Sequence, residues 1–385
     1  MTILTNIAST AWRGAQFAPV EAAGLALGGG RLPMVALDFT HRAWRIAGRG
    51  VPLPMASARL DQSVMDGGER GLLIEPASSN RIFPSAVAPS GWGVNGGATI
   101  APATGVAFAG LAGATITAGT QDWARAQGGA FALTAGAAMT VTVWLRAGTS
   151  GRARLEIFGS GINLVVSGLV GQLAPVFQQG GTVGPVSQVS LGGGVWRVRY
   201  RITPAVTVAS ATLGIGPSVA GGVQTVIAYA AQIESGVAAT GYIATTTAAA
   251  SRPADTPSLA LGGWFRSTAG TIHIDLRPTA ISAQTILTVT DSGGAPQMTV
   301  SCDGSGVVSL SAAGVSLVAG VPLLAGPTQA LALSWGAGGS RLRLGSSTVT
   351  GPAFALPAAA SLRLGPAHAM VQTLFVWDRQ VQPAP

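Results

Sequence analysis

The feature that most restricts the fold of this chain is the alternation of apolar and polar residues along short segments. In "AMTVTVWLRAG" the apolar side chains Met139, Val141, Val143 and Leu145 occupy every second position. Successive side chains of a β-strand point to opposite faces, so this spacing predicts a strand with one buried face. The same alternation recurs in "VWRVRYRITP" (195–204), "TIHIDLRP" (271–278) and "LALSWGAGGSRLRLG" (331–345). Helical periodicity is nearly absent, and the pattern predicts an all-β chain of tandem antiparallel sandwiches.

The alternation also assigns side chains to faces. Five further strands are expected to bury one face each, with these residues on it: Trp196, Val198, Tyr200 and Ile202; Ile227, Tyr229, Ala231 and Ile233; Ile272, Ile274 and Leu276; Leu331, Leu333 and Trp335; Leu342 and Leu344. Trp144 falls on the opposite side of its strand, among Thr140, Thr142 and Arg146. We therefore expect the ring of Trp144 to be exposed or covered by a neighbouring identical chain.

The composition fits a tightly turned β-protein with a weakly charged surface. Glycine accounts for 55 of the 385 residues, roughly twice its usual share, and charged residues make up only 9%. Disorder needs low hydrophobicity and high net charge, and it is not indicated here. No run of about 20 apolar residues is present that would span a bilayer. The first residues lack the pattern of a signal peptide, so we expect synthesis in the cytoplasm without membrane anchoring.

The net charge of +8 raises the question of an anionic partner. All 22 basic residues are arginine, and they are scattered along strands without a block of like charges. No helix-turn-helix, zinc-finger or RNA-binding motif accompanies them, so the sequence does not favour nucleic-acid binding. A surface that binds an anionic polysaccharide would explain the positive charge equally well.

The chain is expected to comprise four segments. Residues 1–80 form an irregular N-terminal attachment segment, and residues 81–250 form the first sandwich. Small residues and two prolines in "TTTAAASRPADTP" predict a linker at 251–257, because proline does not continue a central strand. Residues 258–385 form the second sandwich.

Several short motifs occur in an order that resembles a known family. They are "GLLIEPASSNRI" (71–82), "TVTVWLRAG" (140–148), "VWRVRYRIT" (195–203) and "AQIESGVAATGYIATTTAAASR" (231–252). Together they resemble phage minor structural proteins and tail or head fibre proteins, whose central module is a jelly roll similar to carbohydrate-binding modules. The segments from "TIHIDLRP" to "TLFVWDR" further resemble a concanavalin-like, laminin-G-type sandwich.

The resemblance implies a spike or fibre subunit on the surface of a virion or virus-like particle, assembled in the bacterial cytoplasm. The head spike of a gene transfer agent is one such particle component. The N-terminal segment would attach to a capsid or tail base protein, and identical subunits would form a trimer or pentamer. The sandwiches would bind cell-surface or capsular polysaccharide for adsorption.

Residues for catalysis are sparse. The three histidines, His41, His273 and His368, lie in different segments without cysteine or carboxylate at metal-ligand spacing. No nucleophile elbow, phosphate loop or dinucleotide fingerprint is present, and Cys302 is the single cysteine. We expect no enzyme activity, no cofactor and no metal site. Two alternatives stay open: a purely structural virion protein and a capsule depolymerase.

Two acidic turns raise a further alternative. Asp291 and Asp303 lie in Gly-rich turns and are interpreted as turn acids, with a structural Ca²⁺ site as the alternative.

Sugar-binding sites combine aromatic faces with planar polar groups. Trp123 lies in the Gly-rich context "TQDWARAQGG", flanked by Asp122 and Arg125, and Trp92 lies in "SGWGVNGG". These four residues are the candidate ligand-binding set. The alternative for Trp123 is a buried ring that closes the jelly roll.

The phrase "AQIESGVAATGY" contains polar residues with little reactivity. Gln232, Glu234 and Tyr242 are interpreted as framework residues that close the sandwich, with ligand binding as the alternative.

Overall fold

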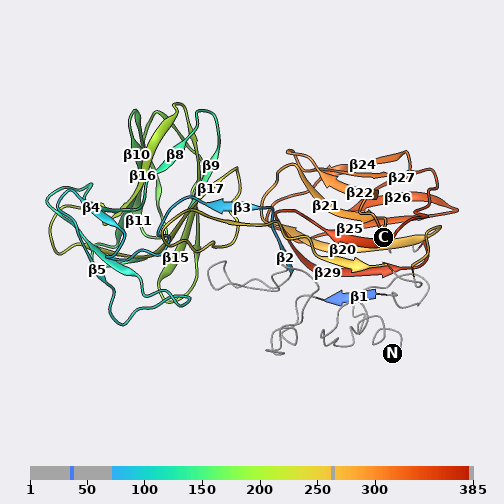
Figure 1. Cartoon of the computed structure of the whole chain (residues 1–385), viewed down its shortest axis with the longest axis horizontal. Coiled ribbons are helices and arrows are strands. Elements are labelled where there is room, and N and C mark those ends of the chain that lie inside the picture. The colour runs from blue at the N-terminus through green and yellow to red at the C-terminus, as the bar shows by residue number, and fades with distance from the viewer. Residues whose placement is uncertain (1–34, 39–71, 262–264, 381–385) are drawn as a thin grey trace. The chain divides into compact units, whose positions relative to one another are not determined.

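The computed structural model describes residues 35–38, 72–261 and 265–380, and its regular elements there are β-strands (Figure 1). Their pairs are antiparallel, so the predicted all-β class of tandem sandwiches is confirmed. The described chain divides into two compact units. The central unit contains residues 78–252, and the C-terminal unit contains residues 35–38, 72–77, 253–261 and 265–380. Within these ranges no helix is long and apolar enough to cross a membrane.

The central unit consists of two main sheets. The first, called the Arg125 sheet, has the order β12 (Ala174–Gln179), β11 (Ile162–Leu169), β10 (Arg152–Gly159), β16 (Val208–Gly216), β7 (Arg125–Gln127) and β4 (Gly93–Asn95), with β8 (Phe131–Leu133) also on β16. The second, called the Trp144 sheet, has the order β13 (Gly181–Val183), β15 (Val195–Pro204), β9 (Met139–Ala147), β17 (Thr225–Ser235), β6 (Ala114–Thr117) and β5 (Thr99–Pro102), with β14 (Ser187–Ser190) also on β15. A short pair joins β3 (Ser78–Asn80) to β18 (Ala250–Arg252).

The core of the central unit lies between its two main sheets. The predicted inner face of β9 is confirmed, because the alternate apolar residues from Met139 to Leu145 are buried in one cluster. They meet Leu155 and Ile157 of β10 and Leu213 and Ile215 of β16 in that cluster. Period-two alternation in both sheets therefore produces a single apolar layer between them.

The C-terminal unit also has two sheets. One, called the Arg341 sheet, has the order β1 (Val35–Asp38), β29 (Ala369–Trp377), β20 (Gly270–Pro278), β25 (Gln329–Gly336), β26 (Gly339–Leu344) and β27 (Ser347–Gly351), with β2 (Leu72–Ile74) also on β29. The other has the order β19 (Ser258–Ala260), β28 (Ser361–Leu364), β21 (Gln284–Thr290), β22 (Pro296–Cys302), β23 (Val307–Ala312) and β24 (Val315–Pro322). The predicted inner faces of β20, β25 and β26 are confirmed by their burial in one core.

The unit boundaries differ from the predicted segments at two places. Leu72 and Ile74 are buried in the C-terminal core, because "GLLIE" supplies a short apolar strand that pairs with β29. The region predicted as a linker begins inside β18, and Asp255 is fully buried there. The backbone N–H of Asp255 donates to the carbonyl of Glu75 at 2.9 Å, and the N–H of Glu75 donates to Asp255 Oδ2 at 3.0 Å. Most of the predicted attachment segment, including His41, lies outside the described residues.

The prediction that Trp144 faces solvent or a neighbouring chain is wrong. Trp144 is fully buried in a second cluster with Phe108 and Tyr229, on the side of the Trp144 sheet away from the main core. The ring of Tyr242 meets it edge-on, with ring centroids 5.3 Å apart. Segments of the same chain therefore cover this face, and the alternation alone could not reveal them.

The predicted faces of β17 are wrong in its first half. A β-bulge between Ala228 and Ala230 shifts the register against β9. Val226 and Ala228 consequently face the main core together with Ala231 and Ile233, whereas Ile227 and Tyr229 face the Trp144 cluster. One extra residue in a strand reverses the faces on one side of it. Trp196, predicted to be buried, is only half-buried.

Candidate functional site

The outer face of the Arg125 sheet brings aromatic and charged side chains into contact. Strand β10 buries Ala153, Leu155 and Ile157, so the alternate residues point outward. These outward residues are Arg152, Arg154, Glu156 and Phe158. In the neighbouring strands, Phe158 lies opposite Asn163 and Thr212, and Arg154 lies opposite Ser167 and Gly216.

Arg125 on β7 is the centre of this face. Its guanidinium carbon lies 3.8 Å from the ring centroid of Phe158 and 5.3 Å from that of Trp123, so it contacts both aromatic residues. Its Nη1 donates to Glu156 Oε2 at 2.8 Å and to the Trp123 carbonyl at 3.3 Å. Arg154 Nε donates to the same Glu156 oxygen at 3.2 Å. Two arginines therefore contact one carboxylate, and two aromatic rings contact the first of these arginines.

Burial shapes the electrostatics of this group. The side chain of Arg125 is only 9% exposed, and burial lowers the pKa of its guanidinium, while the charge of Glu156 opposes that shift. The side chain of Arg154 is 20% exposed. The partly shielded ion pair fixes the orientation of Arg125, and Arg154 extends the positive charge toward solvent.

Gly214 makes room for the arm of Arg125, and Gly216 makes room for the backbone just before β7. A Cβ on Gly214 would overlap Arg125 Cδ, and a Cβ on Gly216 would overlap the carbonyl oxygen of Ala124. Both glycines lie on β16, next to β7. The absence of side chains there lets Arg125 lie across the sheet toward Phe158.

The predicted ligand-binding residues have different surroundings. Trp123 is half-buried and Asp122 is exposed. The ring of Trp123 lies against Gly96, where a Cβ would come within 2.9 Å of Trp123 Cζ3 and where φ is +66°. The structure thus brings Trp123 and Arg125 together and leaves Asp122 at the surface beside them.

Trp92 does not belong to this group. It is 3% exposed, it packs in the main core, and its Nε1 donates to the carbonyl of Pro84 at 3.0 Å. Its ring is not available to a ligand, so the expectation of a binding role is corrected. Gly91 and Gly93 flank Trp92, and that glycine-rich context suggested exposure. It carries no information on which side chains the core buries.

Sequence reasoning missed Glu156, Arg154 and Phe158. Their alternation in "RARLEIFG" was a usable signal, because it places charged and aromatic residues on one strand face. It also missed Phe177 on the edge strand β12, whose side chain is 50% exposed. Phe177 lies opposite Val165 of β11.

The phrase "AQIESGVAATGY" forms a buried hydrogen-bonded clasp over the Trp144 sheet. The Glu234 carboxylate accepts hydrogen bonds from Ser78 Oγ at 2.6 Å, from Thr240 Oγ1 at 2.5 Å and from the Thr240 N–H at 3.0 Å. Gln232 Oε1 accepts from the N–H of Ile243 at 2.6 Å, and Tyr242 bonds with Ser85 at 2.6 Å. These partners support the framework interpretation of Gln232, Glu234 and Tyr242.

The carboxylates of the central unit lie in three separate surroundings. Glu156 contacts two arginines, Glu234 lies in the clasp, and Asp122 is exposed. A glycosidase of the usual type needs two carboxylates on either side of one bond. Glu156 is the carboxylate on the outer face of the Arg125 sheet that accepts hydrogen bonds from both Arg125 and Arg154.

The turn acids of the C-terminal unit hold their own turns. Asp291 Oδ1 accepts from the N–H groups of Gly293 and Ala295, and Asp303 Oδ1 accepts from those of Ser305 and Val307. Both are ordinary turn arrangements in hairpins. Among the described residues no group of three or more histidine, cysteine or acidic side chains could hold a metal ion.

Of the histidines within the described residues, His273 is half-buried and His368 is buried. His273 Nε2 lies 3.1 Å from Asp275 Oδ1, and Thr373 Oγ1 donates to the other oxygen of that carboxylate. Although burial opposes the shift, these hydrogen bonds lower the pKa of Asp275. Burial lowers the pKa of His368 to about 4.

No protein family model matches the chain, and no curated protein matches it in sequence. Solved structures similar to it include the LG1-3 region of the laminin alpha2 chain, at 12% identity and a TM-score of 0.26, covering 66% of this chain and 64% of that one. Domains LG4-5 of the mouse laminin alpha1 chain align at 10% identity and a TM-score of 0.23, covering 78% and 93%. The CBM22 tandem domain of Paenibacillus barcinonensis Xyn10C aligns at 12% identity and a TM-score of 0.28, covering 79% and 98%.

These likenesses are distant. The chain spans slightly less than two thirds of the laminin alpha2 fragment. At such TM-scores they assign no ligand or activity to this chain.

Proposed function

We propose that this chain is a non-enzymatic spike or fibre subunit of a phage-like particle, such as a gene transfer agent head spike, and that it binds cell-surface or capsular polysaccharide. The observation that carries the binding proposal is the contact of Arg125 with Trp123 and Phe158 on one face of a sheet. The assignment to a particle is supported by the ordered motifs in the sequence that resemble phage fibre proteins.

The geometry suits a saccharide for three reasons. Half-buried aromatic rings leave part of an apolar surface open to a sugar ring, and Trp123 and Phe158 both have this exposure. The guanidinium of Arg154 offers planar hydrogen-bond donors to hydroxyl or carboxylate oxygens. The side chains of Arg125, Arg154, Glu156 and Phe158 project from strands, which hold binding groups more rigidly than loops.

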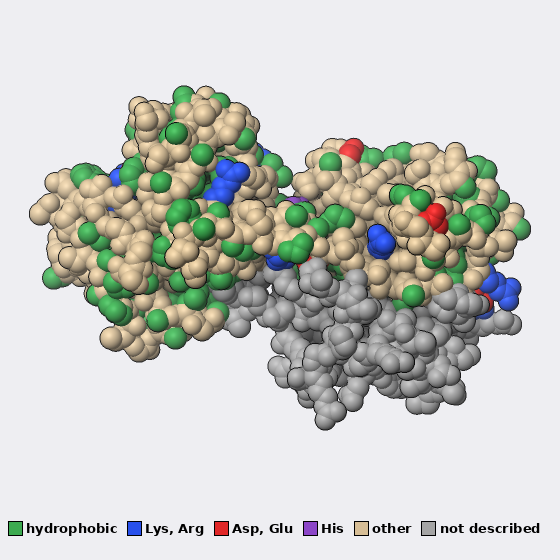
Figure 2. Space-filling view, in the orientation of Figure 1, with side chains coloured by type: hydrophobic (Ala, Val, Ile, Leu, Met, Phe, Trp, Pro, Cys, Tyr) green, Lys and Arg blue, Asp and Glu red, His purple; other side chains and the backbone are tan. Residues whose placement is uncertain are grey.

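A weakly charged surface suits a subunit that is part of an assembly. Figure 2 shows few charged side chains among the described residues on the face in view. In the proposal the N-terminal segment attaches the chain to a capsid or tail base protein, and identical subunits form a trimer or pentamer. Several weak sites on one particle then act together, and avidity exceeds single-site affinity by about 10²–10⁴.

The test compares adsorption of the purified full chain to capsulated and acapsular cells. The Trp123→Ala variant should bind capsulated cells about tenfold more weakly, the loss typical of truncating an aromatic binding residue. Trp196→Ala is the matched control, because Trp196 is a half-buried tryptophan on the other main sheet. Circular dichroism and thermal unfolding establish that both variants remain folded.

The outcomes separate the candidate functions. Retention on capsulated cells without shortening of the polysaccharide supports the proposal. Shortened polysaccharide chains would instead favour a capsule depolymerase. Equal adsorption of the wild-type chain to both strains would remove polysaccharide binding and leave a purely structural virion protein. Equal losses in the Trp123 and Trp196 variants would reject the Arg125 sheet as the binding face.

A further inference from the structure

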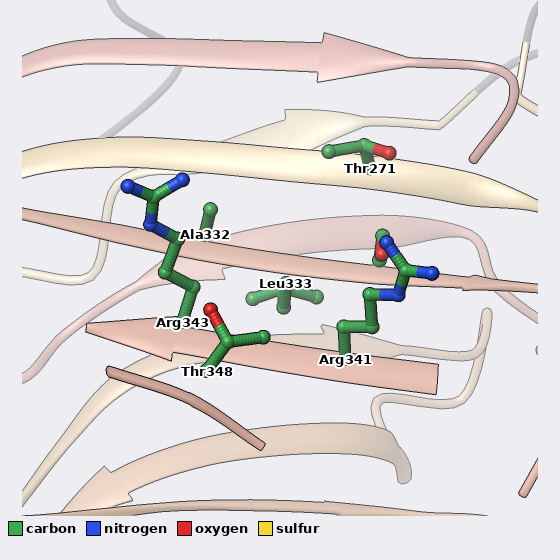
Figure 3. Close-up of a pocket in the computed structure, with 7 residues that line it drawn as sticks. Thr271, Ala332, Leu333, Arg341, Arg343 and Thr348 are labelled. Carbon is green, nitrogen blue, oxygen red and sulfur yellow. The ribbon is translucent and has the colours of Figure 1, made fainter. Parts of the chain in front are cut away.

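A small pocket opens on the outer face of the Arg341 sheet (Figure 3). Its volume is about 70 Å³, and Arg341 and Arg343 rise from β26 on either side of it. Both arginines have interaction partners of their own, so their charges assign no ligand to this pocket. The outer face of the Arg125 sheet is different, because the contacts of Arg125 and Arg154 with Glu156 are established there and the face continues beyond them.

The outer face of the Arg125 sheet extends past β10 to the edge strand β12. Val165 of β11 lies opposite Glu156 of β10, and Phe177 of β12 lies opposite Val165. Directly opposite residues of an antiparallel pair point to the same face of the sheet. Phe177 therefore lies on the same face as Glu156 and Phe158, two strands beyond β10.

Apolar side chains continue along this face toward the edge. Val165 is fully buried, although its strand neighbours Leu164 and Val166 belong to the main core and Val165 does not. Since successive side chains of a strand point to opposite faces, Val165 points outward and is covered by side chains of the outer face. Phe177 is 50% exposed. The outer face thus ends at the sheet edge in an aromatic ring that is half open to solvent.

Amide groups accompany this ring. Gln179 is exposed two residues from Phe177 on the same face of β12, and half-buried Asn163 of β11 lies opposite Gln179. A side-chain amide offers a donor and an acceptor in one plane, which suits adjacent hydroxyl groups of a sugar. Gln178 on the other face accepts a hydrogen bond from the N–H of Val183 at 2.7 Å, which ties β12 to the segment that follows it. The edge strand therefore combines an aromatic ring with a planar polar group and carries no charge of its own.

The strand spacing places Phe177 well away from the contacts of Arg125. Neighbouring strands lie about 4.8 Å apart, and residues rise about 3.3 Å along each strand. Phe158 and Phe177 are two strands and two residues apart in register, so their Cα atoms are separated by about 12 Å. Arg125 lies on β7, two strands from β10 on the other side, so the span from β7 to β12 is about 19 Å. One sugar ring cannot contact both ends, whereas about four residues of an extended chain, at roughly one strand spacing each, can.

We propose that an extended, unbranched stretch of polysaccharide crosses the strands of the Arg125 sheet, with one sugar residue against Trp123 and Phe158 and a later one against Phe177 and Gln179. This binding mode rests on the saccharide binding proposed above and narrows the ligand to a linear run of at least about four sugar residues. A monosaccharide or a side branch would contact one of these places and leave the other open to solvent.

A second copy of this chain is the other occupant that an exposed edge strand can take. Stable protein interfaces contain about 20–30 residues on each side. Strand β12 offers six residues, and two of them are glutamines. The face it shares with the arginine and aromatic contacts of β7 and β10 favours a ligand long enough to touch all three strands. The polysaccharide is therefore the occupant that these contacts favour.

The first experiment measures how affinity depends on the length of the saccharide. Capsular polysaccharide from the capsulated cells is partially hydrolysed and separated by size, and each fraction from monosaccharide to decasaccharide is titrated into the full chain by calorimetry. Affinity should rise about tenfold between the disaccharide and fragments that reach both contacts, the gain expected from one further aromatic contact, and should change little with further length. Equal affinity for the disaccharide and the decasaccharide would overturn the extended binding mode.

Phe177→Ala tests the contact on the edge strand. It should cancel the roughly tenfold gain of the longer fragments and leave the affinity for the disaccharide unchanged, which a general loss of folding would not do. Phe177→Tyr keeps the ring and should bind all fragments as the wild-type chain does. The matched control is Val318→Ala, because Val318 is 51% exposed on β24, at the edge of a sheet in the other unit. This control should bind every fragment with wild-type affinity.

The outcomes separate this binding mode from the proposed function. If Phe177→Ala binds the decasaccharide as tightly as the wild-type chain while Trp123→Ala loses affinity, the contact at Phe177 is rejected and the saccharide site at Trp123 stands. If the wild-type chain binds no fragment, polysaccharide binding itself fails, and the extended binding mode fails with it. A change of oligomeric state in Phe177→Ala during sedimentation, with unchanged fragment binding, would identify β12 as a contact between copies of the chain and overturn the proposal.

Discussion

Replacing Glu234 by Gln tests whether the "AQIESGVAATGY" phrase is a structural clasp. Glu234 is fully buried and accepts three hydrogen bonds, two from hydroxyl groups and one from a backbone N–H. Hydrogen bonds to a charged acceptor contribute about 1.5–3 kcal/mol each, against about 0.5–1.5 kcal/mol for neutral pairs. Three bonds that each lose about 1 kcal/mol lower the free energy of unfolding by about 3 kcal/mol. For a unit of this size the melting temperature should fall by about 6–12 °C.

Urea unfolding followed by far-ultraviolet circular dichroism measures this effect. The chain has two compact units, so we expect the transition of the central unit to move and that of the C-terminal unit to stay. Asp122→Asn is the matched control, because it removes an exposed carboxylate from the same unit and should change stability by less than about 0.5 kcal/mol. A Glu234 variant that unfolds within about 1 kcal/mol of the wild-type chain would refute the clasp.

Four other substitutions or treatments have definite expected results. Gly214→Ala should push the arm of Arg125 aside and weaken saccharide adsorption about tenfold, with a stability loss of about 1–3 kcal/mol in urea unfolding. Burial raises the pKa of Tyr200, whose hydroxyl has no hydrogen-bond partner among the described residues. The stability of the wild-type chain should therefore fall above about pH 10, where the phenol ionises in the unfolded state but not in the folded state. Tyr200→Phe should unfold at no lower urea concentration than the wild-type chain and should not show this loss of stability above about pH 10. Burial lowers the pKa of His368 to about 4. Its contribution to the free energy of unfolding is fully present above the unfolded pKa of about 6.5 and falls by about 3 kcal/mol as the pH drops to about 4. In thermal melts across this pH range, His368→Asn should abolish this loss. Proteolytic cleavage within 253–257 should leave both fragments together in gel filtration, because β1 and β2 pair with β29; separation of the fragments would contradict those pairings.

Much of the fold followed from alternation because the rule is local. The inner faces of β9, β20, β25 and β26 needed only the spacing of apolar residues. The failures occurred where a distant segment decides the environment. Trp144 was assigned to solvent because its strand neighbours are Thr and Arg, yet Phe108 and Tyr242 from other segments cover it.

The bulge in β17 shows a second limit. The run "TVIAYAAQIES" alternates well enough to assign faces, but no residue in it signals that one position is left unpaired. The extra residue between Ala228 and Ala230 becomes visible only when β17 is aligned with β9. Pairing register is a property of two strands, so a pattern within one strand cannot specify it.

The candidate site was predicted only in part for the same reason. Trp123 and Arg125 adjoin in sequence, and their proximity required little inference. Glu156 and Phe158 lie about 30 residues further along, and they join the group because β10 and β7 both pair with β16. The sequence alone could list the aromatic and charged residues, but it could not select those that share a face.

Both arginine-rich faces follow one rule of cross-strand size. Arg125 lies across Gly214 of the adjacent strand, and Arg341 and Arg343 stand opposite Ser334 and Ala332. A long arm can lie flat against a sheet only where the neighbouring strand offers small residues, because a larger side chain at that position would occupy the same space. The many small residues of this chain therefore do more than form turns. Placed beside arginine in register, they allow a β-sandwich with few charges to hold those charges in a fixed direction, which is what recognition of an anionic or polar ligand requires.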